Sequence, residues 1–289
     1  MLGFAVSGCG ERQETASYYY SPHWVRDGKI AFIYGLQSTR KDSLGSQLSS
    51  SYTESAMTIT AAGAGQALLF DATGNPPYLA SCSPTTDYLA YLNDLSNDLF
   101  GKIVIKNISS TSPHTGLEKT ELLFSPGIRS FDWSSDAARL VYCTTQEVRT
   151  ILVSGTGDAL VTAESGLEFV TWKYGGRIAF VHSTSAGKVL SLIYPDGTGR
   201  VNLSVAASVD KPQISAANTN EVYGIAGGSY CKVDVSAATP ATTEISASFT
   251  GSLPRLSPAA DKAVYSKTGE STGIYLLDIA TKVESQLKP

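Results

Sequence analysis

The stretch Ser130–Tyr142 constrains the fold of this chain more than any other, because degraded copies of it recur along almost the whole length. Alternation places Phe131 and Trp133 on one side of a first strand, and Leu140 and Tyr142 on one face of a second. The Ser-Ser-Asp between the two segments is typical of a tight turn. The stretch therefore predicts two antiparallel strands joined by a short turn.

The copies become visible when Trp133 is taken as an anchor and an aromatic residue is required eight or nine positions later. The six anchors are Trp24, Cys82, Trp133, Trp172, Ile214 and Leu256, and their aromatic partners are Phe32, Tyr91, Tyr142, Phe180, Tyr223 and Tyr265. Consecutive anchors lie 39 to 58 residues apart. Four short strands in a unit of about 40 residues make one propeller blade. We therefore predict an all-β, six-bladed β-propeller with four antiparallel strands per blade, scarce helix, and anchors buried between blades.

Charge and hydropathy exclude two classes of partner. The chain has 289 residues and a net charge of −4, and its Lys and Arg residues are too scattered to form the basic stripe that nucleic acid requires. No apolar run reaches the roughly 18 to 20 residues of a membrane helix. We expect contact with a membrane only through a lipid anchor.

The sequence contains no motif that indicates catalysis, a metal or a cofactor. The three histidines, His23, His114 and His182, fall in separate segments and are not expected to converge. There is no G-x-S-x-G nucleophile motif. The segment Asn93–Asp98 has oxygen ligands but lacks the glycine and distal glutamate of an EF-hand loop, so we interpret it as a solvated turn. We predict no catalytic residue, no metal site and no cofactor.

The N-terminus resembles the end of a bacterial lipoprotein signal, with Val6–Cys9 as the lipobox. It lacks a basic segment and a full apolar segment, which a start codon assigned too late would explain. On this interpretation Cys9 is the lipid attachment site, residues 1–17 are a truncated signal and tether, and residues 18–289 are the propeller. Gly10 stands where an aspartate would resemble a signal for retention in the inner membrane, so the sequence favours the outer membrane. The competing interpretation is a frayed terminus with a chance cysteine.

The remaining cysteines, Cys82, Cys143 and Cys231, cannot all pair with one another because their number is odd. Their spacing fits no zinc motif. Cys82 occupies an anchor position, and we predict that it is a small buried hydrophobe.

Two segments of the chain are similar to a known type of sequence repeat. Pro22–Phe32 and Ile193–Leu203 resemble the WD-like repeats of the TolB-type six-bladed propellers, whose pattern is P-x-W-S-P-D-G-x-x-I-A-F followed by an I-Y strand and D-G-x-G. The resemblance covers about residues 18 to 289, but the α/β domain that precedes the propeller of TolB has no counterpart here. It implies the fold and a habit of binding partners, and no specific activity.

Two long insertions predict which face of the ring binds. Gly35–Glu54, expected to be a mobile Ser-rich loop, and Asn93–Gly101 each connect the second and third strands of a blade, and such connections emerge beside the entry to the first strand. We expect the residues four positions before the anchors to ring the channel mouth; they are Tyr20, Tyr78, Arg129, Glu168, Asp210 and Ser252. Tyrosines beside mixed charges suit a polypeptide or a glycan, although ordinary loop residues are the competing interpretation.

These features favour a monomeric, non-catalytic binding module that engages a protein or peptide partner. We expect it on the periplasmic side of a bacterial envelope, lipid-anchored to the outer membrane. The alternative is a propeller lyase or hydrolase that acts on glycans, for which Glu168 and Asp210 are the plausible carboxylates. A third hypothesis is a structural envelope protein whose ring spaces other components.

Overall fold

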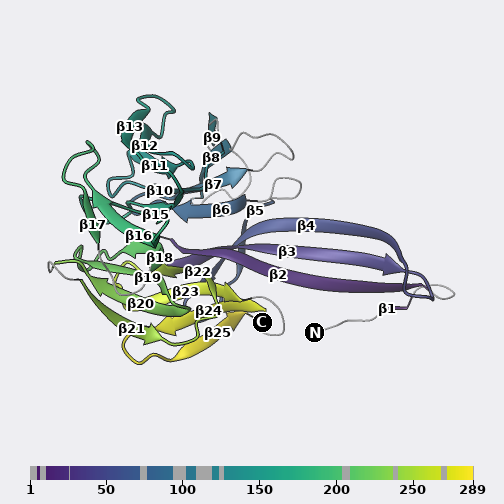
Figure 1. Cartoon of the computed structure of the whole chain (residues 1–289). Helices are drawn as coiled ribbons and strands as arrows, with labels where there is room; N and C mark the ends of the chain where they lie inside the picture. Colours follow the sequence, from purple (N-terminus) through teal and green to yellow (C-terminus); the bar gives the residue numbers. More distant parts are fainter. Residues whose placement is uncertain are drawn as a thin grey trace.

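The fold is a six-bladed β-propeller, as the repeat predicted (Figure 1). The computed structural model describes residues 5–6, 11–25, 27–71, 77–93, 102–108, 119–123, 127–203, 209–236, 240–267 and 272–288. Within these ranges there is no helix, and so none that could cross a membrane. Each blade is a meander of antiparallel strands in sequence order.

The strands of the first three blades begin and end as follows. Blade 1 contains β1 (Ala5–Val6), β2 (Arg12–Trp24), β3 (Lys29–Lys41), β4 (Gln47–Thr60) and β5 (Ala67–Asp71). Blade 2 contains β6 (Pro77–Cys82), β7 (Tyr88–Asn93), β8 (Lys102–Asn107) and β9 (Lys119–Leu123). Blade 3 contains β10 (Ser130–Trp133), β11 (Arg139–Cys143), β12 (Glu147–Leu152) and β13 (Ala159–Ala163).

The last three blades have four strands each. Blade 4 contains β14 (Leu167–Thr171), β15 (Ile178–Thr184), β16 (Gly187–Ile193) and β17 (Val201–Leu203). Blade 5 contains β18 (Val209–Ile214), β19 (Glu221–Ala226), β20 (Ser229–Asp234) and β21 (Ala241–Ser246). Blade 6 contains β22 (Ser252–Leu256), β23 (Lys262–Lys267), β24 (Gly273–Asp278) and β25 (Glu284–Lys288).

The core is divided among the interfaces between neighbouring blades. On β11, Leu140 and Tyr142 pack toward blade 2, whereas Val141 and Cys143 pack toward blade 4. This follows from the period-2 alternation of a strand whose two faces are both covered. All six anchors are buried, as predicted: Trp24, Cys82, Trp133, Trp172, Ile214 and Leu256.

The ring is closed by side-chain packing between blade 6 and blade 1. Trp24 and Phe32 of blade 1 share an apolar cluster with Val264 of blade 6. The indole Nε1 of Trp24 also donates a hydrogen bond to the carbonyl oxygen of Arg255, at 3.0 Å. Trp133 makes the equivalent bond to Ser81 in blade 2, at 2.8 Å. The closing interface therefore uses the same contact as an interior interface, and every blade is built from consecutive strands.

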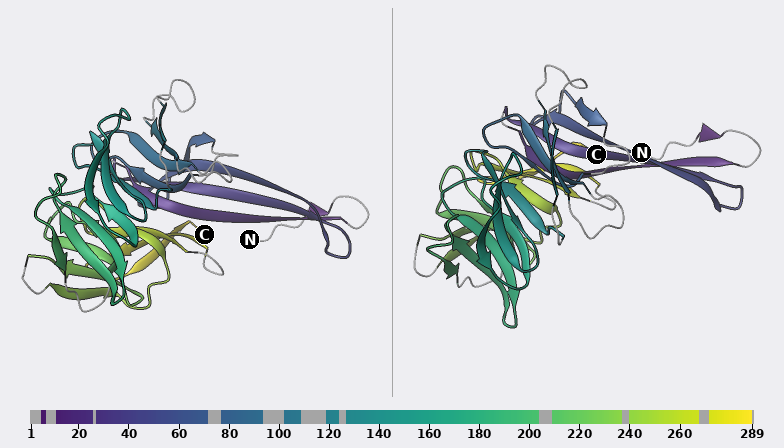
Figure 2. Two further views of the ribbon diagram at one scale, coloured as in Figure 1. Left: turned by 45° about the horizontal axis from the view of Figure 1, so that its top comes forward. Right: turned by 90° about the horizontal axis from the view of Figure 1, so that it is seen from above.

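Blade 1 departs from the predicted pattern. The segment Gly35–Glu54, expected to be a loop, forms the outer halves of β3 and β4, joined by a tight turn at residues 42–46. Residues 12–17, expected to be a tether, form the beginning of β2 and pair with β3. Figures 1 and 2 show these three strands projecting from the ring as a long arm. We define the arm as residues 12–18 together with residues 35–54, which include the turn at 42–46.

Trp133→Ala tests whether the anchors hold the ring together. Trp133 is fully buried, and its truncation empties a large site and removes the bond to Ser81, so we expect a loss of about 3 to 5 kcal/mol in unfolding free energy. Trp133→Phe, which keeps most of the buried ring, should lose less. Denaturant unfolding measures both. An unchanged midpoint for Trp133→Ala would contradict the assignment.

Candidate functional site

The arm carries an unusual share of the exposed apolar side chains. Leu44 at its tip is 90% exposed, and Leu48 and Tyr52 on β4 are 51% and 46% exposed. Tyr18 on β2 is also exposed, and its ring lies 6.2 Å from that of Tyr52. Because these groups gain nothing from the core of the ring, they form a surface that a partner could cover.

A glycine shapes the base of the arm. A Cβ at Gly35 would lie 2.7 Å from the hydroxyl oxygen of Tyr52, so only glycine lets this ring lie across β3. Nearby, the hydroxyl of Tyr20 donates to the carboxylate of the buried Glu54. Burial and the neighbouring Glu54 raise the pKa of Tyr52 to about 12, so the phenol stays protonated.

Two predicted mouth residues, Glu168 and Asp210, come together across blades 4 and 5. Nζ of Lys188 lies 2.6 Å from Oε2 of Glu168 and 3.1 Å from Oδ2 of Asp210. The hydrogen bond from Lys188, with a second from Ser183, lowers the pKa of Glu168. Both carboxylates are therefore paired with one cation at the face from which the arm projects.

The other predicted mouth residues are not gathered in one place. Tyr20 lies at the base of the arm, and Ser252 bonds within its own blade to Ser266. Arg129 is exposed. Tyr78 lies in β6, but its side chain is outside the described residues.

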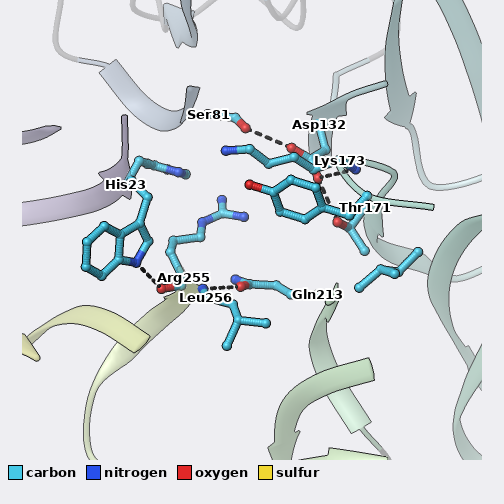
Figure 3. Close-up of a pocket in the computed structure, with 11 residues that line it drawn as sticks. His23, Ser81, Asp132, Thr171, Lys173, Gln213, Arg255 and Leu256 are labelled. Atoms are coloured by element: carbon cyan, nitrogen blue, oxygen red, sulfur yellow. Dashed lines mark hydrogen bonds between the residues drawn. The ribbon is translucent and has the colours of Figure 1, made fainter. Parts of the chain in front are cut away.

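A second cluster lies inside the channel, where the sequence interpretation did not place a site. It is formed by the residue immediately before each anchor, one from every blade: His23, Ser81, Asp132, Thr171, Gln213 and Arg255. Lys173 and Tyr174, which follow the anchor of blade 4, complete it (Figure 3). These positions are at the ends of the inner strands, whereas the arm leaves from their beginnings. The two sites therefore occupy opposite ends of the channel.

Asp132 is saturated with hydrogen bonds. Its Oδ1 accepts from the hydroxyl of Ser81 at 2.8 Å, and its Oδ2 accepts from the hydroxyl of Thr171 at 2.6 Å. The backbone N–H groups of Trp172 and Lys173 also donate to Oδ2, at 3.2 and 3.3 Å. Asp132 thus ties blade 3 to both of its neighbours.

Gln213 plays a similar part between blades 5 and 6. Its Oε1 accepts from the backbone N–H of Leu256 at 2.6 Å, and its Nε2 donates to the carbonyl of Pro254. The polar lining of the channel is therefore also a set of cross-blade hydrogen bonds.

The cationic groups of the channel are in a different situation. His23 and Arg255 are 2% and 8% exposed, and Nε2 of His23 and Nε of Arg255 have no hydrogen-bond partner among the described residues. Burial, together with the charges of Arg255 and Lys173, holds the pKa of His23 well below its ordinary value of 6.5. Burial also lowers the pKa of Lys173. His23 is therefore neutral, with two cations beside it.

The residues of this cluster occupy the same position in every repeat, one before the anchor, but β-bulges in the inner strands make this position difficult to predict from alternation. In blades 1, 5 and 6 the pairing register shifts between the residue four before the anchor and the residue one before it. Ser21 and Lys211, inside two of these bulges, have φ of 50°. A bulge re-aims the following side chain, so simple alternation from the strand entry fails.

The remaining candidates are structural or lie outside the described residues. Cys82, Cys143 and Cys231 are free and buried, which confirms the prediction for Cys82. Burial raises the pKa of Cys82 to about 11. Within the ranges that the structure describes, no three His, Cys, Asp or Glu side chains are grouped as metal ligands would be. Three predicted features lie outside those ranges: Cys9, His114 and most of the insertion Asn93–Gly101.

Comparison with known proteins identifies the fold and no family. No family model matches the chain, and no curated protein sequence matches it. Solved structures do match the chain, and the three described below share 12% identity or less. One is a chain in the crystal structure of a nidogen/laminin complex, with 8% identity, a TM-score of 0.62, and coverage of 94% of this chain and 92% of that one.

Two further matches come from enzymes. An oligogalacturonate lyase in complex with manganese shares 12% identity, with a TM-score of 0.54 and coverage of 99% of this chain and 83% of that one. The β-propeller domain of the trilobed protease from Pyrococcus furiosus, described as having an open velcro topology, shares 10% identity, with a TM-score of 0.54 and coverage of 94% and 98%. At such identities the likeness supports the propeller fold alone.

The buried His23 predicts a component of the pH dependence of stability. Its pKa is depressed in the folded state, so the unfolded chain binds the proton more tightly and stability falls as the pH drops below about 6.5. Between pH 7.5 and pH 5.5 His23 should account for a loss of at most about 1.4 kcal/mol, the limit for a histidine that stays neutral in the folded protein. His23→Gln should lack this loss in urea unfolding, while other titrating groups act equally on both proteins. An identical pH dependence would contradict the prediction.

Proposed function

We propose that the protein is a non-catalytic binding module that engages a protein or peptide partner through the arm and the adjoining face of the ring. The observation that carries this proposal is the arm itself. None of its residues 38–51 is buried, so the ring does not need them for its core. Closure entropy makes such an insertion cheap to keep, and use as a binding surface explains its exposed apolar side chains.

The edge of β4 supports the same function. Residues 47–53 pair with β3 on one side, and in the described part of the chain no strand lies on the other, because β5 pairs only with residues 55–58. The sequence there, Gln-Leu-Ser-Ser-Ser-Tyr-Thr, has neither charge nor proline. Natural edge strands are usually protected by such residues. An open edge beside Leu48 and Tyr52 suits a partner that adds a strand and buries alternate side chains.

The alternative, a glycan lyase or hydrolase, has weaker support. A general acid needs a raised pKa, and that of Glu168 is lowered by Lys188. The matched lyase shows that a propeller of this shape occurs among enzymes. At 12% identity, the match assigns no active-site residue to this chain. The nidogen/laminin match is to a chain from a protein complex, which is the closer analogy to a protein-binding role.

The cellular setting belongs to the same proposal. The repeats resemble the TolB type, and a lipid at Cys9 would anchor the chain in a bacterial outer membrane. Strand β2 begins at Arg12, at the far end of the arm (Figure 1). The three residues from Cys9 to Arg12 span at most about 11 Å. A lipidated Cys9 would therefore place the tip of the arm at the membrane and the ring above it. The partner would then be met close to the membrane surface.

Removal of the arm tests the binding surface. In the variant, a short Gly-Ser link replaces residues 38–51, between the paired residues Gln37 and Tyr52. The melting transition should be preserved because no core residue is lost. Capture of a partner from detergent-solubilised envelope should be abolished. A variant that captures the same partner as before would place the site elsewhere.

A matched pair of substitutions separates the arm from exposed apolar surface in general. Leu44→Ser combined with Leu48→Ser should weaken capture about tenfold or more, the scale of losing interface anchors worth at least 1.4 kcal/mol. Leu160→Ser changes a side chain that is 50% exposed on β13 of blade 3 and should leave capture intact. Equal losses in both proteins would argue against a specific role of the arm.

The lipid anchor is tested by fractionation. Expression in a bacterium from an upstream start codon should yield protein in the membrane fraction, and Cys9→Ser should release it into the soluble fraction, because the lipid is the only membrane attachment expected. A Cys9→Ser protein that stays with the membrane would refute the lipobox.

A further inference from the structure

We propose that the channel cluster is a binding site for one small oxyanion, a carboxylate or phosphate group, held by Arg255 and Lys173 with His23 beside them. This site is separate from the partner surface on the arm, since it lies at the opposite end of the channel. Figure 3 shows the side chains of His23, Lys173 and Arg255 pointing into one shared space.

Unpartnered polar atoms in a buried position are the first observation. In the part of the chain that the structure describes, Nε of Arg255 and Nε2 of His23 have no hydrogen-bond partner, although both residues are more than nine-tenths buried. A buried donor without a partner is costly, and the great majority in folded proteins are satisfied by protein, water or ligand. An oxygen acceptor placed between these residues satisfies the guanidinium directly.

The charge balance gives the second observation. Arg255 and Lys173 face the same space, and neither forms an ion pair within the described residues. Asp132 is the carboxylate of the cluster, and four hydrogen bonds from Ser81, Thr171 and two backbone N–H groups already occupy its oxygens. Two cations against one saturated carboxylate leave a net positive charge in a poorly hydrated site.

This charge balance distinguishes an anion from a water molecule. A water can accept from Arg255, but it carries no charge, so the net positive charge that remains after Asp132 is counted is left uncompensated. An oxyanion offers several acceptor lone pairs and one negative charge, and guanidinium and ammonium groups are the side chains that bind carboxylate and phosphate. His23 can add a third hydrogen bond through Nε2.

The dimensions restrict the ligand to a single small group. The space that the centre of a water molecule can occupy is ≈ 20 Å³, and a single water needs about 10 to 15 Å³ on this measure. A sugar or a peptide cannot enter as a whole. Lys173 and Tyr174 are only partly buried, so the ligand enters past these two side chains, at the end of the channel where inner strands end.

Titration calorimetry on the full-length chain tests the proposal, with sodium phosphate and sodium acetate as probes at constant ionic strength. Phosphate represents a phosphoryl group, and acetate represents the carboxylate of an acidic side chain or a C-terminus. We expect saturable binding of at least one of the two, with one site per chain. Sodium chloride is the comparison for a monatomic anion.

Three variants assign the binding to the channel. Lys173→Met removes a charge from a partly exposed side chain whose Nζ lies over the ring of Tyr174 and makes no hydrogen bond within the described ranges, so the protein should fold and bind at least tenfold more weakly. Arg255→Met should abolish binding, with near-ultraviolet circular dichroism as the check on folding. Lys262→Met, the same change at a partly exposed lysine at the start of β23, should bind as the natural protein does.

Two results would overturn the proposal. The first is the absence of saturable binding of either oxyanion to the natural protein, including the case in which only chloride binds. The second is equal binding by the natural protein and Lys173→Met.

Discussion

The packing of one inner-strand anchor against the neighbouring blade is the contact on which the whole ring depends. Each blade covers both faces of its sheet only by lying between two others, and the anchors occupy the centre of those interfaces. Trp24 closes the ring onto Arg255 as Trp133 joins blade 3 to Ser81. The closing interface needs no exchanged strand because it repeats an interior one.

This division of the core explains how blade 1 can carry the arm. Its contribution to the interfaces includes Ile33 on β3 and Ala56 on β4, and farther out none of residues 36–53 is buried. The arm is held by cross-strand hydrogen bonds and not by burial. The ring therefore fixes the direction of the arm, while the surface of the arm is left for contacts with another molecule.

The sequence predicted those features that repeat and missed those that occur once. Trp133 and its five counterparts identified six blades because burial at each interface demands an apolar side chain in the same register. The arm was mistaken for a loop because residues 36–53 bury nothing and so show no apolar alternation. Its signal was Asp42, whose side chain accepts from Leu44 and Ser46 in a tight turn between two segments of similar length. The channel was missed because bulges shift the register between Tyr20 and His23, so that alternation counted from the strand entry points to the wrong positions.

Site-specific photocrosslinking tests the central claim, that the arm is the surface on which a partner binds, most directly. A photoreactive phenylalanine replaces Tyr52 on the arm in one protein and Leu160 on β13 in another, and both are irradiated in intact cells that make the protein. We predict one discrete adduct from position 52 and none from position 160. Adducts of the same pattern from both positions, or none from the arm, would contradict the account.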